Sequence, residues 1–278
     1  MPAGRAGLMQ PMERISSRQN ALVKELKRLA DNKRARLEAR CALSEGDHLL
    51  RTMLDAGVQP TLIALAARAA TDAALQGVLQ RCGDARCVVI DDAIFDQIAP
   101  TDSPAGLLAL SPLPLASAKP DAGVDTLVLE AVQDPGNVGS LIRTAVAAGV
   151  RQIVLSPGCA DVWSPRCLRA AQGAQWLARI FADTDPVGFL TNYQGDVAAT
   201  ILQGGQNLYV QSFSHPVAWL FGNEGQGLSP ELVGLATKRV TIPMPGAMES
   251  LNVNAAAAVC LFEQVRQRSV TGLETGKA

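Results

Sequence analysis

Three segments in the second half of the chain place polar side chains and glycines where strands and helices meet. In the first, residues 129–149, an apolar run passes through a turn into a helical pattern that contains Asn137 and Arg143. At 100° per residue, Arg143 lies about 130° from the centre of the apolar stripe, so it can project into a cleft. Taken alone, the segment is also compatible with an ordinary exposed arginine and with Asn137 as a simple helix cap.

The second segment, residues 220–230, is an apolar run that enters a glycine-rich loop around Asn223 and Glu224. Three glycines permit close approach of the backbone to another group. The spacing differs from G-x-G-x-x-G, and no Lys-Ser or Lys-Thr pair follows, so neither a dinucleotide-binding fold nor a P-loop is indicated. By itself the segment is a generic glycine-rich turn before a capped helix.

The third segment, residues 240–256, joins a short strand to the last helix through a loop with two prolines. By itself it predicts a loop followed by a helix capped by Asn252. The three segments become specific only when they are taken together and in this order.

Together the three segments resemble the SpoU-type, or TrmH-type, RNA ribose 2′-O-methyltransferases of the knotted SPOUT superfamily. The residues that carry the resemblance are Asn137 and Arg143 in the first motif, Gly222, Asn223, Glu224 and Gly227 in the second, and Ile242, Pro243, Met244, Gly246, Ser250, Leu251 and Asn252 in the third. Residues 15–20, 45–46 and 106–109 also resemble the substrate-binding domain of that family. One departure is Ala171, where relatives often carry serine.

The resemblance implies S-adenosylmethionine as cofactor, structured RNA (ribosomal or transfer RNA) as substrate, a homodimer, and no metal. Its cofactor-binding residues would be Gly222, Asn223, Glu224, Gly227, Ile242, Met244, Ser250 and Leu251, and its catalytic residues would be Arg143, Asn137, Glu224, Ser250 and Asn252. Within that set, Arg143 would hold a phosphate beside the target ribose, and Asn137 and Asn252 would position ribose or cofactor. Glu224 would orient Arg143 or nearby loop amides.

The elements that must position these residues form an α/β fold. A chain of 278 residues with 48% apolar and 18% charged residues is long enough for two compact units, and short apolar runs alternate with helical patterns along it. We expect a disordered N-terminus (1–12), a small α/β RNA-binding domain similar to certain ribosomal proteins (13–111) and a linker (112–124). The resemblance implies that a SPOUT domain with a deep trefoil knot (125–268) follows, and after it we expect a flexible tail (269–278). The segment 253–262 is apolar on nearly every face, which predicts burial on all sides, in the core or at a subunit interface.

The charge is uneven, although the net charge is only −1. Residues 1–40 contain ten Lys or Arg and four Asp or Glu, which leaves a balance of +6. Two basic helices are expected between residues 20 and 40, and they predict either a solvated helix face or a surface that contacts phosphates.

Cysteine usage and hydropathy place the protein in a reducing, cytoplasmic compartment. The six cysteines form no C-x-x-C pair and only two histidines accompany them, which argues against a zinc site. No targeting segment is evident, and the longest apolar run, residues 255–262, is too short for a membrane span.

The sequence therefore predicts an RNA 2′-O-methyltransferase that favours ribosomal RNA over transfer RNA. The alternative is a catalytically idle RNA-binding or ribosome-assembly factor with the same fold. A nucleotide-dependent oxidoreductase lacks the required glycine spacing.

Overall fold

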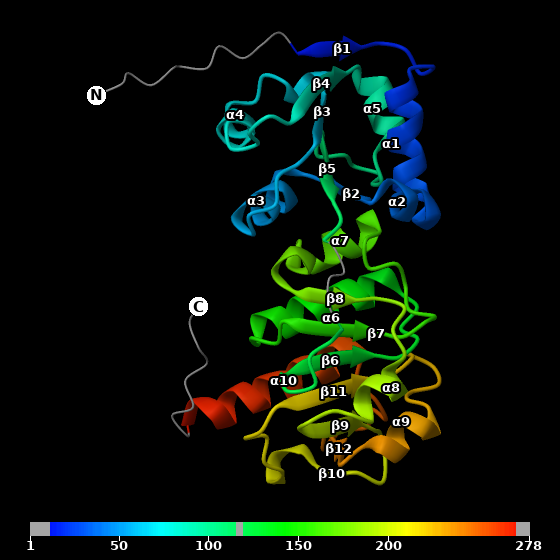
Figure 1. Cartoon of the computed structure of the whole chain (residues 1–278), viewed down its shortest axis with the longest axis vertical. Helices are drawn as coiled ribbons and strands as arrows, with labels where there is room; N and C mark the ends of the chain where they lie inside the picture. The colour runs from blue at the N-terminus through cyan, green and yellow to red at the C-terminus, as the bar shows by residue number, and fades with distance from the viewer. Residues whose placement is uncertain (1–11, 115–118, 271–278) are drawn as a thin grey trace, which may run out of the picture. The chain divides into compact units, whose positions relative to one another are not determined.

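A computed structural model describes residues 12–114 and 119–270 of the chain. The chain divides into two compact units, Met1–Leu113 and Pro114–Ala278 (Figure 1). Most of the expected disordered N-terminus and flexible tail falls outside the described residues. The last helix continues to Val270, two residues beyond the expected domain end at 268.

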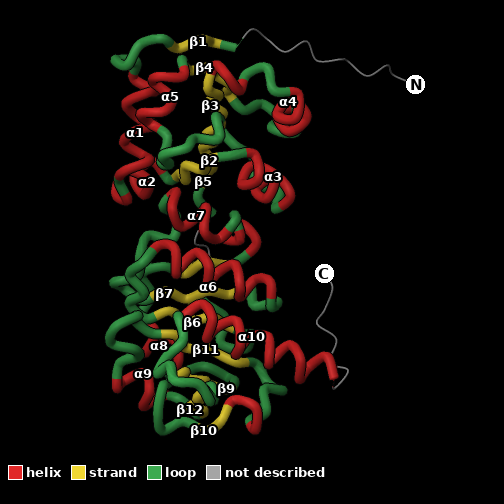
Figure 2. Tube along the Cα trace, turned by 180° about the vertical axis from the view of Figure 1, so that it is seen from behind, coloured by secondary structure: helices red, strands yellow, loops and turns green. Residues whose placement is uncertain are grey.

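The N-terminal unit is one mixed sheet with helices on both faces. Its described strands are β1 (Glu13–Ile15), β2 (Cys41–Glu45), β3 (Leu62–Ala66), β4 (Arg86–Ile90) and β5 (Leu107–Pro112), arranged in the order β1-β4-β3-β5-β2. Its described helices are α1 (Ala21–Asp31), α2 (Lys33–Ala39), α3 (Asp47–Asp55), α4 (Ala73–Leu79), α5 (Asp92–Ile98) and the 3-10 turn η1 (Ala67–Ala69). Helix α1 packs on α2 and α5, while α3 packs on α4 on the other side of the sheet (Figures 1 and 2).

The two expected basic helices are confirmed as α1 and α2. Asn20 caps α1, because its side-chain oxygen accepts a hydrogen bond from the amide of Leu22 at 2.8 Å. The apolar positions of α1, Val23, Leu26 and Leu29, are buried against the unit's core. The basic segment is thus an integral part of the N-terminal unit and not an appended arm.

The C-terminal unit is built on a parallel sheet. Its described strands are β6 (Thr126–Leu129), β7 (Gln152–Leu155), β8 (Arg179–Phe181), β9 (Asp196–Thr200), β10 (Gln206–Asn207), β11 (Val217–Phe221) and β12 (Lys238–Thr241), arranged in the order β10-β12-β9-β11-β6-β7-β8. Its described helices are α6 (Pro135–Ala147), α7 (Pro165–Ala171), α8 (Pro186–Leu190), α9 (Pro230–Leu235) and α10 (Val253–Val270), with the 3-10 turns η2 (Ala174–Leu177) and η3 (Leu208–Val210).

The central strands are buried on both faces, as their continuous apolar runs predict. Alternate residues such as Val128 and Leu220 pack towards α8 and α9 in one hydrophobic cluster. On the opposite face, Trp219 meets α10 through a buried hydrogen bond to Gln264. Helix α6 packs on α7 and on α10.

The closest helix crossing in this unit depends on a glycine. An ideal Cβ at Gly139 would lie 2.4 Å from the carbonyl oxygen of Cys167 and 2.7 Å from the Cβ of Ala170. Only glycine therefore allows α6 to lie this close to α7. Ala171, where relatives often carry serine, is fully buried in α7 and faces no solvent.

Candidate functional site

A cavity of about 590 Å³ opens beside the carboxyl ends of β9, β11 and β12. These three strands are neighbours and parallel, so the loops that leave them meet at one edge of the sheet. In open α/β sheets this edge is where ligands bind. The cavity is therefore formed by the topology of the unit.

The lining of the cavity includes every residue that the sequence assigned to cofactor binding. These residues are Gly222, Asn223, Glu224, Gly227, Ile242, Met244, Ser250 and Leu251. Of the expected catalytic residues, Glu224, Ser250 and Asn252 also line it, whereas Asn137 and Arg143 do not. The second and third motifs, although about twenty residues apart in the chain, thus meet around one space.

The loop after β11 is a tight turn closed by its own backbone. The amide of Asn223 donates to the carbonyl of Gly227 at 3.1 Å, and the amide of Gly227 donates to the carbonyl of Asn223 at 2.8 Å. Gly227 has a φ of +71°, in the left-handed region that favours glycine. The glycines of the second motif are therefore explained by the turn itself.

The side chain of Asn223 helps to hold this turn. Its Oδ1 accepts hydrogen bonds from the amides of Gly225 and Gln226, and its Nδ2 donates to the carbonyl oxygen of Ala131 at 2.9 Å. Ala131, which the sequence did not single out, has a φ of +50° just after β6. Asn223 thus ties the loop to the chain just after β6.

The third motif ends in a capped helix, as expected. The side-chain oxygen of Asn252 accepts from the amide of Asn254 at 2.9 Å, at the start of α10. Ser250 and Leu251 precede this cap and are exposed to the cavity. The capping bond uses the oxygen of the Asn252 side chain, and Asn252 itself lines the cavity.

The first motif begins with a capped helix, but the cap is not the expected residue. Asp134 caps α6 by accepting from the amide of Asn137 at 2.9 Å, and Pro135 occupies the first helical position. A second contact to Asp134 comes from Arg166 of α7 at 2.9 Å. The side chain of Asn137 is therefore available for another partner.

That partner is Glu224 of the second motif. Asn137 Nδ2 donates to Glu224 Oε1 at 2.9 Å, and the amide of Gln133 lies 3.5 Å from Glu224 Oε2. Burial raises the pKa of Glu224, but hydrogen bonds from Asn137 and from backbone amides at the start of α6 outweigh it and lower the pKa overall. Glu224 is thus held as a carboxylate at the N-terminus of α6, where the helix dipole favours negative charge.

Arg143 lies on the exposed side of α6, as its position off the apolar stripe predicts. Its guanidinium has no hydrogen bond or ion pair with another described residue of the chain. Of the two partners expected for Glu224, Arg143 or nearby loop amides, Arg143 makes no described contact with it; Glu224 accepts from Asn137, from the amide of Gln133 and from its own amide in the loop. Arg143 is a free cation carried by the same helix as Asn137.

Two parts of the site were missed by sequence reasoning. Thr200, Ile201 and Leu202 line the cavity because β9 lies between β11 and β12, and only the strand order reveals this. Asn254 donates from its Nδ2 to Asn137 Oδ1 at 2.7 Å, across 117 residues of sequence. Its position two residues after Asn252 was the only available signal.

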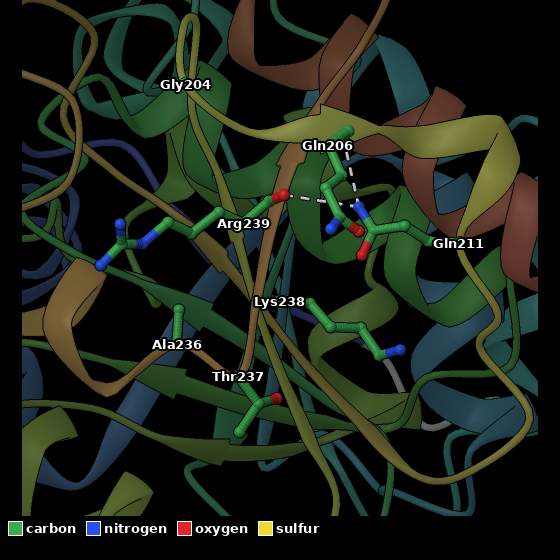
Figure 3. A pocket seen from close by; sticks show the side chains of 7 residues that line it. All are labelled: Gly204, Gln206, Gln211, Ala236, Thr237, Lys238 and Arg239. Atoms are coloured by element: carbon green, nitrogen blue, oxygen red, sulfur yellow. Dashed lines mark hydrogen bonds between the residues drawn. The ribbon is translucent and has the colours of Figure 1, made fainter.

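A second cavity of about 450 Å³ lies beside β10 and β12 and contains none of the expected site residues (Figure 3). One of its polar groups is held by the backbone: Gln211 Nε2 donates to the carbonyl oxygens of Gln206 and Arg239. Lys238 pairs with Asp196 at 3.6 Å and points to the opposite side of the strand from Arg239.

Several cations in the basic segment of the N-terminal unit, residues 12–40, already form ion pairs or hydrogen bonds, which the composition alone does not reveal. Lys27 pairs with Asp31, and Arg34 pairs with Glu38, within their own helices. Arg36 is buried and donates to the carbonyl oxygen of Leu29 at 2.5 Å.

Three cations of this segment remain exposed and have no partner among the described residues, namely Arg18, Lys24 and Arg40.

No helix in the described part of the chain is long and apolar enough to span a membrane. Nor do residues 12–114 and 119–270 contain a group of three or more metal-binding side chains.

Comparison with known proteins agrees with both units. The model of the SpoU rRNA Methylase family matches residues 126–262, and the model of the MRM3-like substrate binding domain matches residues 20–109.

Several similar proteins match along nearly their whole length. The 23S rRNA (guanosine(2553)-2′-O)-methyltransferase RlmP of Bacillus subtilis is 32% identical, over 90% of this chain and 98% of that protein. An uncharacterised tRNA/rRNA methyltransferase of Synechocystis is 34% identical, over 91% and 94% of the two chains. The crystal structure of an AdoMet-bound rRNA methyltransferase from Sinorhizobium meliloti has a TM-score of 0.79 at 28% identity, and the match covers 92% of this chain and 98% of that one. The chain therefore belongs to the SpoU rRNA methylase family.

Proposed function

We propose that this protein transfers a methyl group from S-adenosylmethionine to a ribose 2′-hydroxyl of structured RNA, with ribosomal RNA favoured over transfer RNA. The observation that carries the proposal is the single cavity lined by the second and third motifs, with Asn137 hydrogen-bonded to one of its lining residues. Family membership supplies the reaction class, and the RlmP relative supplies the preference for ribosomal RNA.

The cavity fits a nucleoside cofactor in size and lining. Its volume of about 590 Å³ falls in the usual range of small-molecule sites. Apolar side chains such as Ile201, Ile242 and Met244 can cover an adenine ring, while the exposed backbone of the 222–228 loop can pair with its polar edge. When bound there, S-adenosylmethionine supplies an electrophilic methyl group on a sulfonium.

The residues of the chain then have to align the acceptor oxygen and help remove its proton. The positive charge of the sulfonium and the negative charge that develops on the acceptor oxygen cancel in the transition state. An oxyanion hole is therefore of little use, and alignment of the acceptor oxygen with the methyl carbon and the sulfur matters most. Arg143 stays protonated, because a guanidinium loses its proton only above about pH 12. It therefore grips the phosphate beside the target ribose and favours the alkoxide, while the hydroxyl proton leaves to a water.

Other residues of the motifs position the ribose, the cofactor and the cofactor loop relative to α6. Asn252 and Ser250, which both line the cavity, position the ribose or the cofactor. Asn137 and Glu224 connect α6, which carries Arg143, to the cofactor loop. In this scheme Glu224 acts on the loop and on the start of α6, and not on Arg143 directly.

RNA is held by the N-terminal unit, for which we keep the expected domain bounds 13–111. Its match to a substrate-binding domain and the unpaired cations Arg18, Lys24 and Arg40 support this assignment. Unpaired cations are the ones that phosphates can neutralise without first breaking an ion pair.

The working form of the protein is a homodimer that uses α10. Within one chain Ala257 is fully buried, but Phe262 stays 47% exposed on the outer side of the helix, where Ala255 is also exposed. An apolar stripe of this kind suits a two-fold contact with the same stripe of a second copy.

The C-terminal unit is knotted, as the family resemblance implies. The return of the chain from β12 to pack α10 on α6 supports this assignment. Stretching single molecules from the two ends of this unit tests it, because a tightened knot leaves the chain shorter than its full contour length.

Two measurements test the proposed function. Calorimetry of the purified chain should show binding of S-adenosylmethionine and of its demethylated product. Incubation with cofactor labelled in the methyl group should then transfer label to ribosomal RNA from cells that lack this protein. Cofactor binding without transfer to any RNA would favour the catalytically idle RNA-binding factor.

A further inference from the structure

Three side chains far apart in sequence form one directed chain of hydrogen bonds beside the cavity. Asn254 Nδ2 donates to Asn137 Oδ1 at 2.7 Å, and Asn137 Nδ2 donates to Glu224 Oε1 at 2.9 Å. Asn254 belongs to α10, Asn137 to α6 and Glu224 to the loop after β11. The chain thus joins the three motifs through side chains.

The direction of these bonds is fixed by chemistry. A carboxylate only accepts hydrogen bonds, so Asn137 must turn its amino group towards Glu224. That leaves the Asn137 oxygen facing Asn254, and only a donor at position 254 can pair with it. An acceptor there would oblige Asn137 to turn over and place its oxygen against the Glu224 carboxylate.

We propose that Asn254 is a positioning residue that fixes the amide of Asn137, and through it holds the 222–228 cofactor loop against the helix that carries Arg143. This inference rests on the proposed function for its catalytic consequence, but not for the hydrogen-bond chain itself. Asn254 does not line the cavity and acts only through Asn137.

The loop keeps its internal structure without Asn254, because Asn223 holds it independently through Gly225, Gln226 and Ala131. Removal of Asn254 should therefore leave the cofactor site formed and disturb only its alignment with α6. The expected signature is a loss in the rate of methyl transfer without an equal loss in cofactor affinity.

The hydrogen-bond chain is tested by reversing its polarity. In the double variant Asn254→Asp with Glu224→Gln, Asn137 can turn over, donate to the new carboxylate and accept from the new amide, which restores both bonds. Glu224→Gln should therefore lower the thermal midpoint in the unmodified protein and raise it in the Asn254→Asp background. The same shift in both backgrounds would overturn the proposal.

In the Asn254→Asp background, Glu224→Gln also removes the repulsion between two carboxylates, which could by itself raise the thermal midpoint. Measurements at high salt separate this charge effect from the hydrogen-bond effect. At about 1 M salt, charges are screened beyond about 3 Å, whereas hydrogen-bond polarity is unaffected. The reversal should persist at this salt concentration, and its disappearance would contradict the proposal. The experiment needs neither RNA nor cofactor, so it remains decisive even if the unmodified protein transfers no methyl group.

The catalytic consequence is tested with Asn254→Ala, which should lower kcat about tenfold, the rate equivalent of one hydrogen bond. Cofactor affinity by calorimetry should stay within about twofold, a difference too small to account for that rate loss. Asn254→Ser keeps a hydroxyl donor and should retain more of kcat than the alanine variant. The matched control is Asn192→Ala, which removes an exposed amide that donates only to the carbonyl of Gly188. An unchanged kcat in Asn254→Ala, or a loss of cofactor affinity as large as the loss of rate, would overturn the positioning role.

Discussion

Gly222 is the position where a single added methyl group should damage the cofactor site most. An ideal Cβ there would lie 2.2 Å from the carbonyl carbon and oxygen of Gly227 and 2.4 Å from the amide nitrogen of Leu228. All three are backbone atoms, held by the two hydrogen bonds between Asn223 and Gly227. The backbone of the turn must therefore move to accept alanine at position 222.

The cost of Gly222→Ala follows from those contacts. Overpacking of this kind costs about 1–3 kcal/mol, and each of the two backbone hydrogen bonds contributes about 1 kcal/mol. We expect a loss of about 2–3 kcal/mol in the free energy of unfolding, or about 5–10 °C in the thermal midpoint for a chain of this size. Because the moved amides and carbonyls form the rim of the cavity, cofactor affinity should fall at least about tenfold, as for the loss of one or two hydrogen bonds.

Gly225→Ala is the matched control in the same loop. A Cβ at Gly225 meets only the side-chain oxygen of Asn223, at an ordinary 3.5 Å. Thermal unfolding and calorimetry with S-adenosylmethionine should separate the two variants clearly. Equal midpoints and equal affinities for Gly222→Ala and Gly225→Ala would refute the assignment of this loop as a tightly closed part of the cofactor site.

Three further predictions concern catalysis, RNA binding and assembly. Arg143→Ala should leave the thermal midpoint nearly unchanged, since the side chain is exposed, but lower methyl transfer at least about a hundredfold. Arg143→Lys should stay nearly inactive, because an ammonium cannot replace the planar two-pronged guanidinium; recovery of the rate would show that charge alone is sufficient. Arg18→Ala and Lys24→Ala should each reduce by about one the slope of log affinity for RNA against log salt, whereas Lys27→Ala, already paired within α1, should change it less. Equal slopes for all three would place the RNA contact elsewhere. Phe262→Arg should shift the protein from dimer to monomer in light scattering without loss of fold, and an unmodified protein that is monomeric at micromolar concentration would contradict the dimer.

Local patterns were sufficient to predict the elements that carry the motifs. Strand β11 ends at Phe221, where the expected apolar run enters the glycine-rich loop, and it is apolar throughout because it is buried on both faces. The apolar stripe of α6, which includes Val138 and Leu141, is buried as its spacing predicts. These features depend on neighbours within a few residues, which the sequence displays directly.

What the sequence did not predict depends on contacts between distant segments. The place of β9 between β11 and β12, which brings residues 200–202 to the cavity, follows from strand pairing and from no local pattern. The bond between Asn254 and Asn137 spans 117 residues. Likewise, the net charge of residues 1–40 did not show that Lys27 and Arg34 already have partners.

Because the N-terminal helices are part of a hydrophobic core, RNA binding has to be tested with single substitutions and not with a deletion. Deletion of residues 1–40 would remove α1, whose Val23, Leu26 and Leu29 are buried in the N-terminal unit. Such a truncation would remove part of the hydrophobic core together with the cations. Single substitutions of exposed, unpaired cations avoid this loss.

The most direct test of the central claim is the chemical position of the transferred methyl group. Ribosomal RNA from cells that lack this protein is incubated with the purified protein and S-adenosylmethionine labelled in the methyl group, and the product is hydrolysed in alkali. Alkaline cleavage needs a free 2′-hydroxyl, so a 2′-O-methylated ribose should leave the label in an alkali-resistant dinucleotide. Label in mononucleotides would show methylation of a base, and no label in any RNA would show that the chain is not the methyltransferase proposed here.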